Sequence, residues 1–217
     1  MPLVPVVADM NHANPVDFAK LAAAGFVGVI LKARQGVGFE DPAFKPRRDA
    51  ARKAGLKVGA YDFATHDIVA DNVKAFLNTT GIDPDLSYWL EFEDNVRSQR
   101  TGDQAAQFLD WVDQAIGRRC GIYGGNRIRE QIDDTDPADV SWWAEHPLWL
   151  CQYKDDPALR DADLATLKPH IHIPAQWKTW FLLQYAADGH GPQPRGAPGV
   201  ESGADLNVFD GTADELR

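Results

Sequence analysis

The stretch of sequence that decides the fold is residues 26–63, which read FVGVILKARQGVGFEDPAFKPRRDAARKAGLKVGAYDF. It begins with the largely apolar run 26–33, continues through a helical stretch over 43–54 and ends with a second apolar run over 57–63. Strands that are apolar on both faces and separated by a helix are typical of a parallel sheet covered by helices. We therefore predict a strand–helix–strand unit in this segment.

The same alternation extends over the first 125 residues. Further strands are predicted at 3–8, 88–92 and 119–123, and further helices at 16–24, 68–78 and 101–116. This succession fits a closed barrel or an open doubly wound sheet. A dinucleotide-binding sheet would need a glycine-rich turn after the first strand, and residues 9–12 (DMNH) contain none, which favours the barrel. Beyond residue 125 the helical pattern fades, and strands are predicted at 148–153, 180–185 and 204–208.

Composition and charge exclude several classes of protein. The chain has 217 residues, enough for one domain with a sizeable core, and its net charge of -10 disfavours binding to nucleic acid. No apolar run reaches the roughly 18–20 residues of a membrane span, and the N-terminus lacks the basic region of a secretory signal. The two cysteines, Cys120 and Cys151, are predicted to be buried packing thiols.

Acidic residues stand at or near the ends of four predicted strands: Asp9, Asp62, the pair Glu91 and Glu93, and Asp205. In a parallel barrel, functional side chains lie where the strands end. Glu91 and Glu93 are two residues apart on one strand, so their side chains share a face and their Cα atoms lie about 6.6–7 Å apart. A close pair of carboxyl groups, of which one keeps its proton, is what glycoside hydrolysis uses.

Several motifs in a fixed order extend this interpretation. They are KARQGVGFEDPAF at 32–44, GAYDF at 59–63, LEFE at 90–93, GIY at 121–123, LWLCQY at 148–153, LQY at 183–185 and DLNVFDG at 205–211. Together they resemble the glycoside hydrolase family 25 lysozymes, the Chalaropsis-type muramidases of phages, bacteria and fungi. The resemblance covers nearly the whole chain.

The resemblance implies an α/β fold, a TIM-like barrel of eight strands with a reduced helix complement, (β/α)5(β)3. It also implies cleavage of the β-1,4 bond between N-acetylmuramic acid and N-acetylglucosamine in peptidoglycan. The family's proton donor falls on Glu93 and its acidic partner on Glu91. Its flanking aspartates fall on Asp9 and Asp205, which we expect to hold Glu93 and to raise its pKa. The side chains that we expect to contact the substrate are Tyr61, Asp62, Tyr123, Trp149 and Gln184.

Three departures from the family pattern bear on activity. Glu91 replaces the usual aspartate, Asp62 replaces the usual histidine, and the pair Arg34-Gln35 replaces the usual Thr-Glu. The longer Glu91 side chain displaces the charge by about 1.5 Å, and a displacement of that size can lower a rate by about 10²-fold. We expect activity to be retained, because the donor and the flanking acids are present. Retaining, inverting and substrate-assisted routes all stay open.

The remaining expectations concern organisation and partners. We expect a single catalytic barrel domain over residues 1–217 without a separate wall-binding domain, and a monomer whose partner is the glycan strands of peptidoglycan. Synthesis in the cytoplasm without a classical signal peptide and action at the bacterial cell wall, as for a phage endolysin, are expected, without membrane insertion. No cofactor or metal is expected, because His170 and His172 have ligand spacing but no third ligand nearby. The alternatives are a catalytically impaired glycan-binding barrel and a glycosidase that acts on another N-acetylhexosamine polymer.

Overall fold

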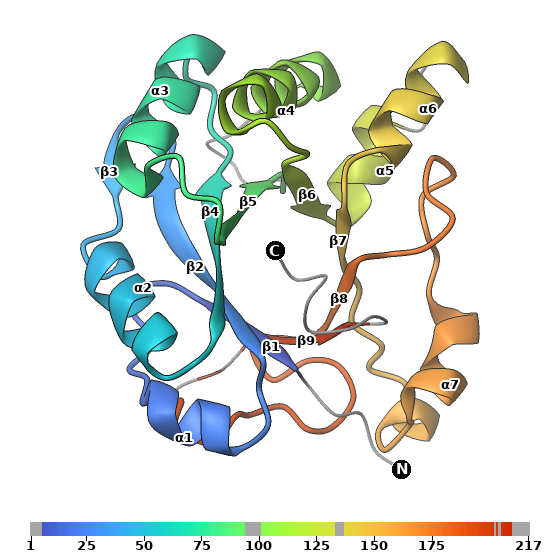
Figure 1. Cartoon of the computed structure of the whole chain (residues 1–217). Coiled ribbons are helices and arrows are strands. Elements are labelled where there is room, and N and C mark those ends of the chain that lie inside the picture. Colours follow the sequence, from blue (N-terminus) through green and yellow to red (C-terminus); the bar gives the residue numbers. More distant parts are fainter. Residues whose placement is uncertain (1–5, 94–100, 133–136, 202, 204, 210–217) are drawn as a thin grey trace.

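Eight strands close into a barrel in the computed structural model of the chain, which describes residues 6–93, 101–132, 137–201, 203 and 205–209. In chain order they are β1 (Val7–Met10), β2 (Gly28–Gln35), β4 (Lys57–Phe63), β5 (Leu86–Glu91), β6 (Gly121–Gly124), β7 (Leu148–Cys151), β8 (Leu182–Ala186) and β9 (Asp205–Phe209). Neighbouring strands pair around the ring, and β1 pairs with both β2 and β9, so the sheet closes on itself (Figure 1). The predicted barrel is confirmed.

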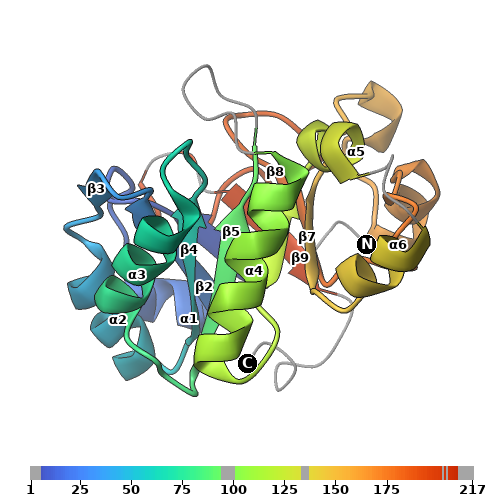
Figure 2. The same ribbon diagram turned by 90° about the horizontal axis from the view of Figure 1, so that it is seen from above.

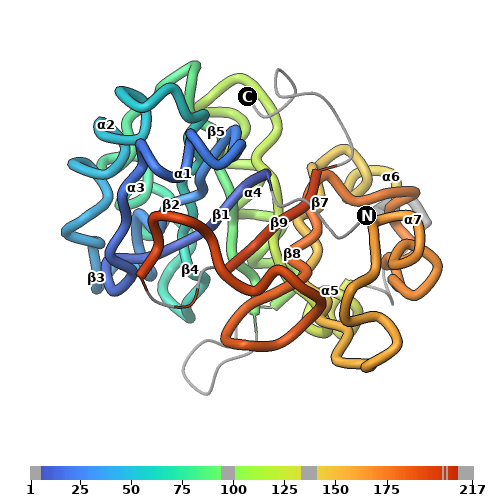
Figure 3. The backbone as a smooth tube through the Cα atoms, turned by 90° about the horizontal axis from the view of Figure 1, so that it is seen from below, coloured from blue at the N-terminus to red at the C-terminus, as the bar shows by residue number. Residues whose placement is uncertain are grey.

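Helices cover the outside of the first five strands. They are α1 (Phe18–Ala23), α2 (Phe44–Lys53), α3 (Val69–Thr80), α4 (Gly102–Ile116), α5 (Asn126–Ile132) and α6 (Pro137–Ala144), and Figure 2 shows α3 beside α4 on one flank. Between β7 and β8 the chain forms only the short turns η1 (Pro157–Leu159), α7 (Leu164–Leu167) and η2 (Lys168–His170), and largely irregular segments connect the last strands (Figure 3). This is the (β/α)5(β)3 arrangement. Within the described ranges no helix is long and apolar enough to cross a bilayer.

The last strand runs against the direction of its neighbours. Strands β1, β2, β4, β5, β6, β7 and β8 run parallel to one another, whereas β9 is antiparallel to both β8 and β1. Because of this reversal, the first residue of β9 lies at the end of the barrel where the parallel strands finish. The register pairs Asp205 with Asp9, so the structure brings acids from the first and last strands together.

Helix ends follow from local sequence signals. The hydroxyl of Thr101 accepts a hydrogen bond from the backbone N–H of Gln104, and the side chain of Gln104 accepts one from the backbone N–H of Thr101. This reciprocal pair satisfies two amide groups that the first turn of α4 leaves without helical partners. Gly117 ends the helix with a φ of 71°, a left-handed conformation that suits glycine. The helix predicted over 101–116 agrees with these boundaries.

Two regions differ from the sequence prediction. A short strand, β3 (Phe39–Glu40), folds back on β2, and the buried Arg34 holds this hairpin by bonding Glu40, Thr79 and the backbone carbonyl of Val37. Arg34, one of the departures from the family pattern, therefore has a structural role. Helices α5 and α6 also occur where the helical pattern fades, because α5 spans only seven residues and buries two of them, too few to display a period.

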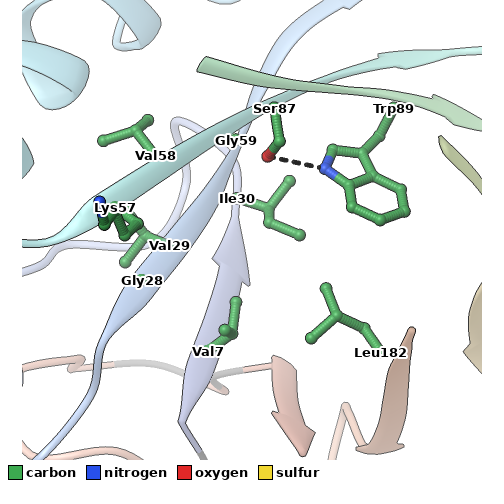
Figure 4. Close-up of a pocket in the computed structure, with 10 residues that line it drawn as sticks. All are labelled: Val7, Gly28, Val29, Ile30, Lys57, Val58, Gly59, Ser87, Trp89 and Leu182. Atoms are coloured by element: carbon green, nitrogen blue, oxygen red, sulfur yellow. Dashed lines mark hydrogen bonds between the residues drawn. The ribbon is translucent and has the colours of Figure 1, made fainter. Parts of the chain in front are cut away.

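Large side chains fill the inside of the barrel. They are Val7, Ile30, Tyr61, Trp89, Tyr123, Trp149 and Leu182. Trp149 makes edge contacts with Tyr61, Trp89 and Tyr123, with ring centroids 6.4, 5.6 and 4.5 Å apart. The cavity at the amino end of the strands, where Trp89 donates to the hydroxyl of Ser87, has a volume of about 10 Å³ (Figure 4). That is no more than one water occupies, so this end of the barrel is closely packed.

Candidate active site

Four carboxyl groups meet at the end of the barrel where the parallel strands finish. Asp9 stands in β1, Glu91 ends β5, Glu93 follows two residues later, and Asp205 begins β9. Burial raises the pKa of Asp9, of Glu91 and of Asp205, and the negative charge of Glu93 raises each of them further. The structure therefore groups the predicted acids so closely that they cannot all be ionised at neutral pH.

Glu93 is the acid of this cluster that borders an open pocket. The pocket has a volume of about 400 Å³, and its other lining residues are Gly125, Asn126, Arg127, Arg129, Cys151, Gln152 and Tyr153. Burial raises the pKa of the Glu93 carboxyl above its ordinary value. A carboxyl group that holds its proton toward neutral pH and faces a pocket can act as a general acid.

Tyr123, rather than the flanking aspartates, is the hydrogen-bond partner of Glu93. The hydroxyl of Tyr123 has a single proton, which it donates to Oε1 of Gln184 at 2.7 Å. The contact with Tyr123 lowers the pKa of Glu93 and so opposes the effect of burial. Burial is what raises the pKa of Glu93, and the expectation that Asp9 and Asp205 hold the donor and raise its pKa stays a prediction.

A chain of hydrogen bonds fixes Asp9 below the pocket. Nε2 of Gln184 donates to both carboxylate oxygens of Asp9, at 3.1 and 3.0 Å, and Nδ2 of Asn207 donates to one of them at 2.7 Å. Oε1 of Gln184 accepts from the hydroxyls of Tyr123, at 2.7 Å, and Tyr153, at 2.5 Å. Burial raises the pKa of Asp9 to about 6, although these two amide donors favour its anion.

We expect Gln184→Leu to lower the free energy of unfolding by about 2 kcal/mol, because it leaves buried polar groups of Asp9, Tyr123 and Tyr153 without a partner. Urea denaturation measures the change. The matched control is Gln114→Leu on the exposed side of α4, which should stay within about 0.5 kcal/mol of the wild type. An equally small change for Gln184→Leu would contradict the importance of this network.

Asp205 shows how charge and burial combine in the cluster. Burial and the nearby charges of Asp9, Asp188 and Glu93 raise its pKa from 3.8 to about 8. The folded protein therefore binds a proton at this site more tightly than the unfolded chain does. The stabilising contribution is complete below about pH 4, where both forms are protonated, and it is lost as the pH rises toward 8.

Between pH 5 and pH 8 the free energy of unfolding should consequently fall less for Asp205→Asn than for the wild type. The difference between the two falls should be on the order of 2 kcal/mol. Chemical denaturation at the two pH values measures the difference. Asp161→Asn, which removes an exposed carboxylate from a loop, should keep the wild-type dependence. If the unfolding free energy of wild type and Asp205→Asn falls equally between the two pH values, the raised pKa of Asp205 is contradicted.

Glu91 lies deeper than Glu93 and faces a cation that sequence reasoning missed. Its Oε2 atom is buried and has no hydrogen-bond partner among the residues that the structure describes. Burial raises the pKa of Glu91 well above its ordinary value, and the positive charge of Lys32 opposes the shift. Lys32 stands in β2, donates to Gln35 at 2.9 Å and lies over the ring of Phe63. Lys32 lies two residues after Ile30, whose side chain faces the barrel interior, so alternation along the strand places Lys32 on the same face. This spacing could have identified Lys32 from the sequence.

The predicted substrate contacts divide into two groups. Tyr61 and Tyr123 lie with the acids, because the charge of Glu91 is among the causes that, after burial, raise the pKa of each tyrosine. Gln184 is 2% exposed and orients Asp9, and Trp149 is 2% exposed and donates to Asn207 at 2.6 Å. Gln184 and Trp149 therefore belong to the hydrogen-bond network around Asp9 and Asn207, and contact of these four side chains with substrate stays a prediction.

Asp62 is displaced from the site altogether. It is fully buried, and Nδ2 of Asn72 in α3 donates to its carboxylate at 2.9 Å. Tyr61 and Phe63, its neighbours in β4, have their side chains on the inner face, so Asp62 projects outward beneath the helix. The prediction that Asp62 contacts substrate is wrong, because consecutive residues of a strand point to opposite faces.

The two cysteines have different positions. Cys120 is fully buried, as predicted. Cys151 ends β7 and is partly exposed where it lines the pocket beside Glu93, so its prediction as a buried packing thiol is wrong. Burial still raises the pKa of Cys151 to about 11. The thiol therefore stays protonated at neutral pH and is a poor nucleophile.

Known proteins resemble the chain over most of its length. The family Glycosyl hydrolases family 25 matches residues 9–193. The chain is 24% identical over 191 residues to the uncharacterized protein YegX of Escherichia coli O157:H7, covering 86% of this chain and 60% of YegX. It is 23% identical over 197 residues to the autolytic lysozyme of Clostridium acetobutylicum, covering 89% of this chain and 52% of that protein. The chain thus spans only about half to three fifths of the length of these curated relatives.

Its fold also matches a solved structure. The bacterial lysozyme from Streptomyces coelicolor superposes with a TM-score of 0.76 at 20% sequence identity, covering 96% of this chain and 93% of that one. At this identity the likeness establishes the arrangement of the strands and helices.

Proposed function

Because the chain belongs to glycosyl hydrolases family 25, we propose that it is a peptidoglycan hydrolase that cleaves the β-1,4 bond between N-acetylmuramic acid and N-acetylglucosamine. The observation that carries the proposal is the position of Glu93, a carboxyl group with a raised pKa at the edge of an open pocket and next to a second acid. Its place of action would be the bacterial cell wall.

In the proposed reaction, Glu93 donates its proton to the glycosidic oxygen as the bond breaks. The sugar carbon becomes positively charged, and the Glu91 carboxylate stabilises it from the same face of β5. Burial favours the protonated forms of both Glu91 and Glu93, and the charge of Lys32 opposes this shift at Glu91, which makes Glu91 the member of the pair that the proposal assigns to the anion. Tyr123 orients the donor, and Asp9, held by Gln184 and Asn207, contributes negative charge to the cluster.

The test is mass analysis of the fragments released from purified peptidoglycan. Cleavage of the proposed bond leaves N-acetylmuramic acid at the reducing end of every fragment, whereas cleavage of the other glycosidic bond leaves N-acetylglucosamine there. Incubation with chitin oligomers addresses the alternative of a hydrolase for another N-acetylhexosamine polymer. Fragments that end in N-acetylglucosamine, or release from chitin alone, would refute the proposed specificity.

A further inference from the structure

The pocket beside Glu93 is positively charged although the whole chain carries a net charge of -10. Two arginines of α5, Arg127 and Arg129, line it, and Lys154 follows the lining residue Tyr153. Glu93 is the acidic residue among the described residues that line this pocket, and burial favours its neutral form. The pocket therefore collects positive charge immediately next to the proposed proton donor.

The orientation of Arg129 is fixed by neutral groups. Its guanidinium donates to Oδ1 of Asn126 at 2.6 Å and to the backbone carbonyl of His172 at 3.2 Å. Across the described part of the chain, no salt bridge joins Arg129 or Lys154 to an acid. Burial lowers the pKa of Lys154, and the positive charge of Arg129 lowers it further. Arg129, which is oriented without a counter-charge, and the neighbouring Lys154 form a place for an anion.

Arg127 provides a third charge and a different kind of support. Its guanidinium lies over the ring of Phe92, 5.6 Å from the centroid. Phe92 is the residue between Glu91 and Glu93, so this contact ties α5 to the segment that carries the proposed catalytic pair.

We propose that Arg129 and Lys154 form a carboxylate-binding subsite for the substituent that muramic acid carries and N-acetylglucosamine lacks. The inference rests on the proposed function. Muramic acid bears a lactyl ether whose carboxylate is either free or joined to a stem peptide that has carboxylates of its own. Guanidinium groups bind carboxylates through paired hydrogen bonds. A volume of about 400 Å³ lies within the range of ligand pockets, so the side of the sugar that faces α5 has room for this substituent.

The subsite gives the pocket a means to tell peptidoglycan from chitin. Both polymers have the same β-1,4 linkage and the same acetamido groups, so the acid pair alone does not distinguish them. An anion bound beside Glu93 places the muramic acid ring next to the donor and leaves an uncharged N-acetylglucosamine polymer without this contact. Discrimination then depends on charge and is reduced by salt.

The experiment measures binding in the Glu93→Gln background, so that no ligand is cleaved. The variant Arg129→Gln/Lys154→Gln is compared with Lys53→Gln/Lys74→Gln, which removes two charges from exposed positions on α2 and α3. Calorimetry gives the Kd for three soluble glycans: strands that carry stem peptides, strands from which an amidase has removed the peptides, and chitin oligomers. The readout is the ratio of each muramic acid Kd to the chitin Kd.

We expect the subsite variant to raise this ratio about tenfold, because it weakens binding to muramic acid strands by about 1.4 kcal/mol and does not affect binding to chitin. The control pair should leave the ratio unchanged. A change for peptide-bearing strands alone assigns the anion to the stem peptide, and a change for peptide-free strands alone assigns it to the free lactyl carboxylate. An equal change for both strands means that the subsite accepts either carboxylate. The same ratio in all proteins would overturn the subsite. Fragment release by the wild type is scored separately, so a protein that binds selectively but cleaves nothing refutes the proposed function and keeps the subsite.

Discussion

Replacing Glu93 with glutamine is expected to slow the clearing of cell-wall suspensions by about 10³-fold, because an amide cannot deliver a proton to the glycosidic oxygen. Glutamine has nearly the shape of a protonated glutamic acid, so the contact with Tyr123 and the wall of the pocket are kept. The measurement is the loss of turbidity of purified walls at equal protein concentrations. Sedimentation with the same walls should show that the variant still binds.

The matched control for this experiment is Glu201→Gln, which removes a carboxylate from an exposed position and should clear walls at the wild-type rate. Retained binding together with lost clearing identifies a chemical role for Glu93. Equal clearing by wild type and Glu93→Gln would mean that another group supplies the proton.

The Glu91→Gln variant should lower the clearing rate by about 10²-fold and at the same time stabilise the fold. The rate falls because a neutral amide does not stabilise the positive sugar carbon. Stability rises because the burial and like charges that raise the pKa of Glu91 make its ionisation costly in the folded state. That cost grows as the pH rises above the ordinary pKa of a glutamate, so the gain in unfolding free energy should be larger at pH 8 than at pH 5.

Turbidity assays and urea denaturation at both pH values measure the two effects. Glu91→Asp keeps the charge on a shorter side chain and should retain activity within about tenfold of the wild type. If Glu91→Gln clears walls as fast as the wild type, Glu91 has no part in the reaction. If clearing falls but stability falls too, the like-charge description of the cluster is wrong.

The arrangement of strands and helices was predictable because its causes are local. The segment 26–63 has a strand, helix and strand with clear apolar runs, and Thr101 and Gly117 bracket α4 with a capping pair and a left-handed residue. Helix α5 was missed because it buries only two residues. The β3 hairpin depends on Arg34 bonding Thr79, a contact between distant parts of the chain that no local pattern reveals.

The acids of the candidate site were predictable from their positions at strand ends, and their roles were not. Side chains alternate between the two faces of β4, so Asp62 points outward because its neighbour Tyr61 points inward. This orientation could have been predicted from the sequence. The function of Gln184 could not be read in advance, because it joins groups from β1, β6 and β8 that meet only when the barrel closes. The pairing of Arg129 with Lys154 could not be predicted either, because Arg129 lies in α5 and Lys154 follows β7, and the two come together only in the folded chain.

Because β1 pairs with β9, the partners of Asp9 lie almost two hundred residues further along the chain. During translation, Asp205 and Asn207 leave the ribosome long after Asp9, and a contact over so long a separation forms slowly. Until it forms, Asp9 lacks an amide donor and the acid cluster lacks one of its charges. The cluster is therefore complete only after β9 has joined β1, and the timing of barrel closure sets when the site comes into existence.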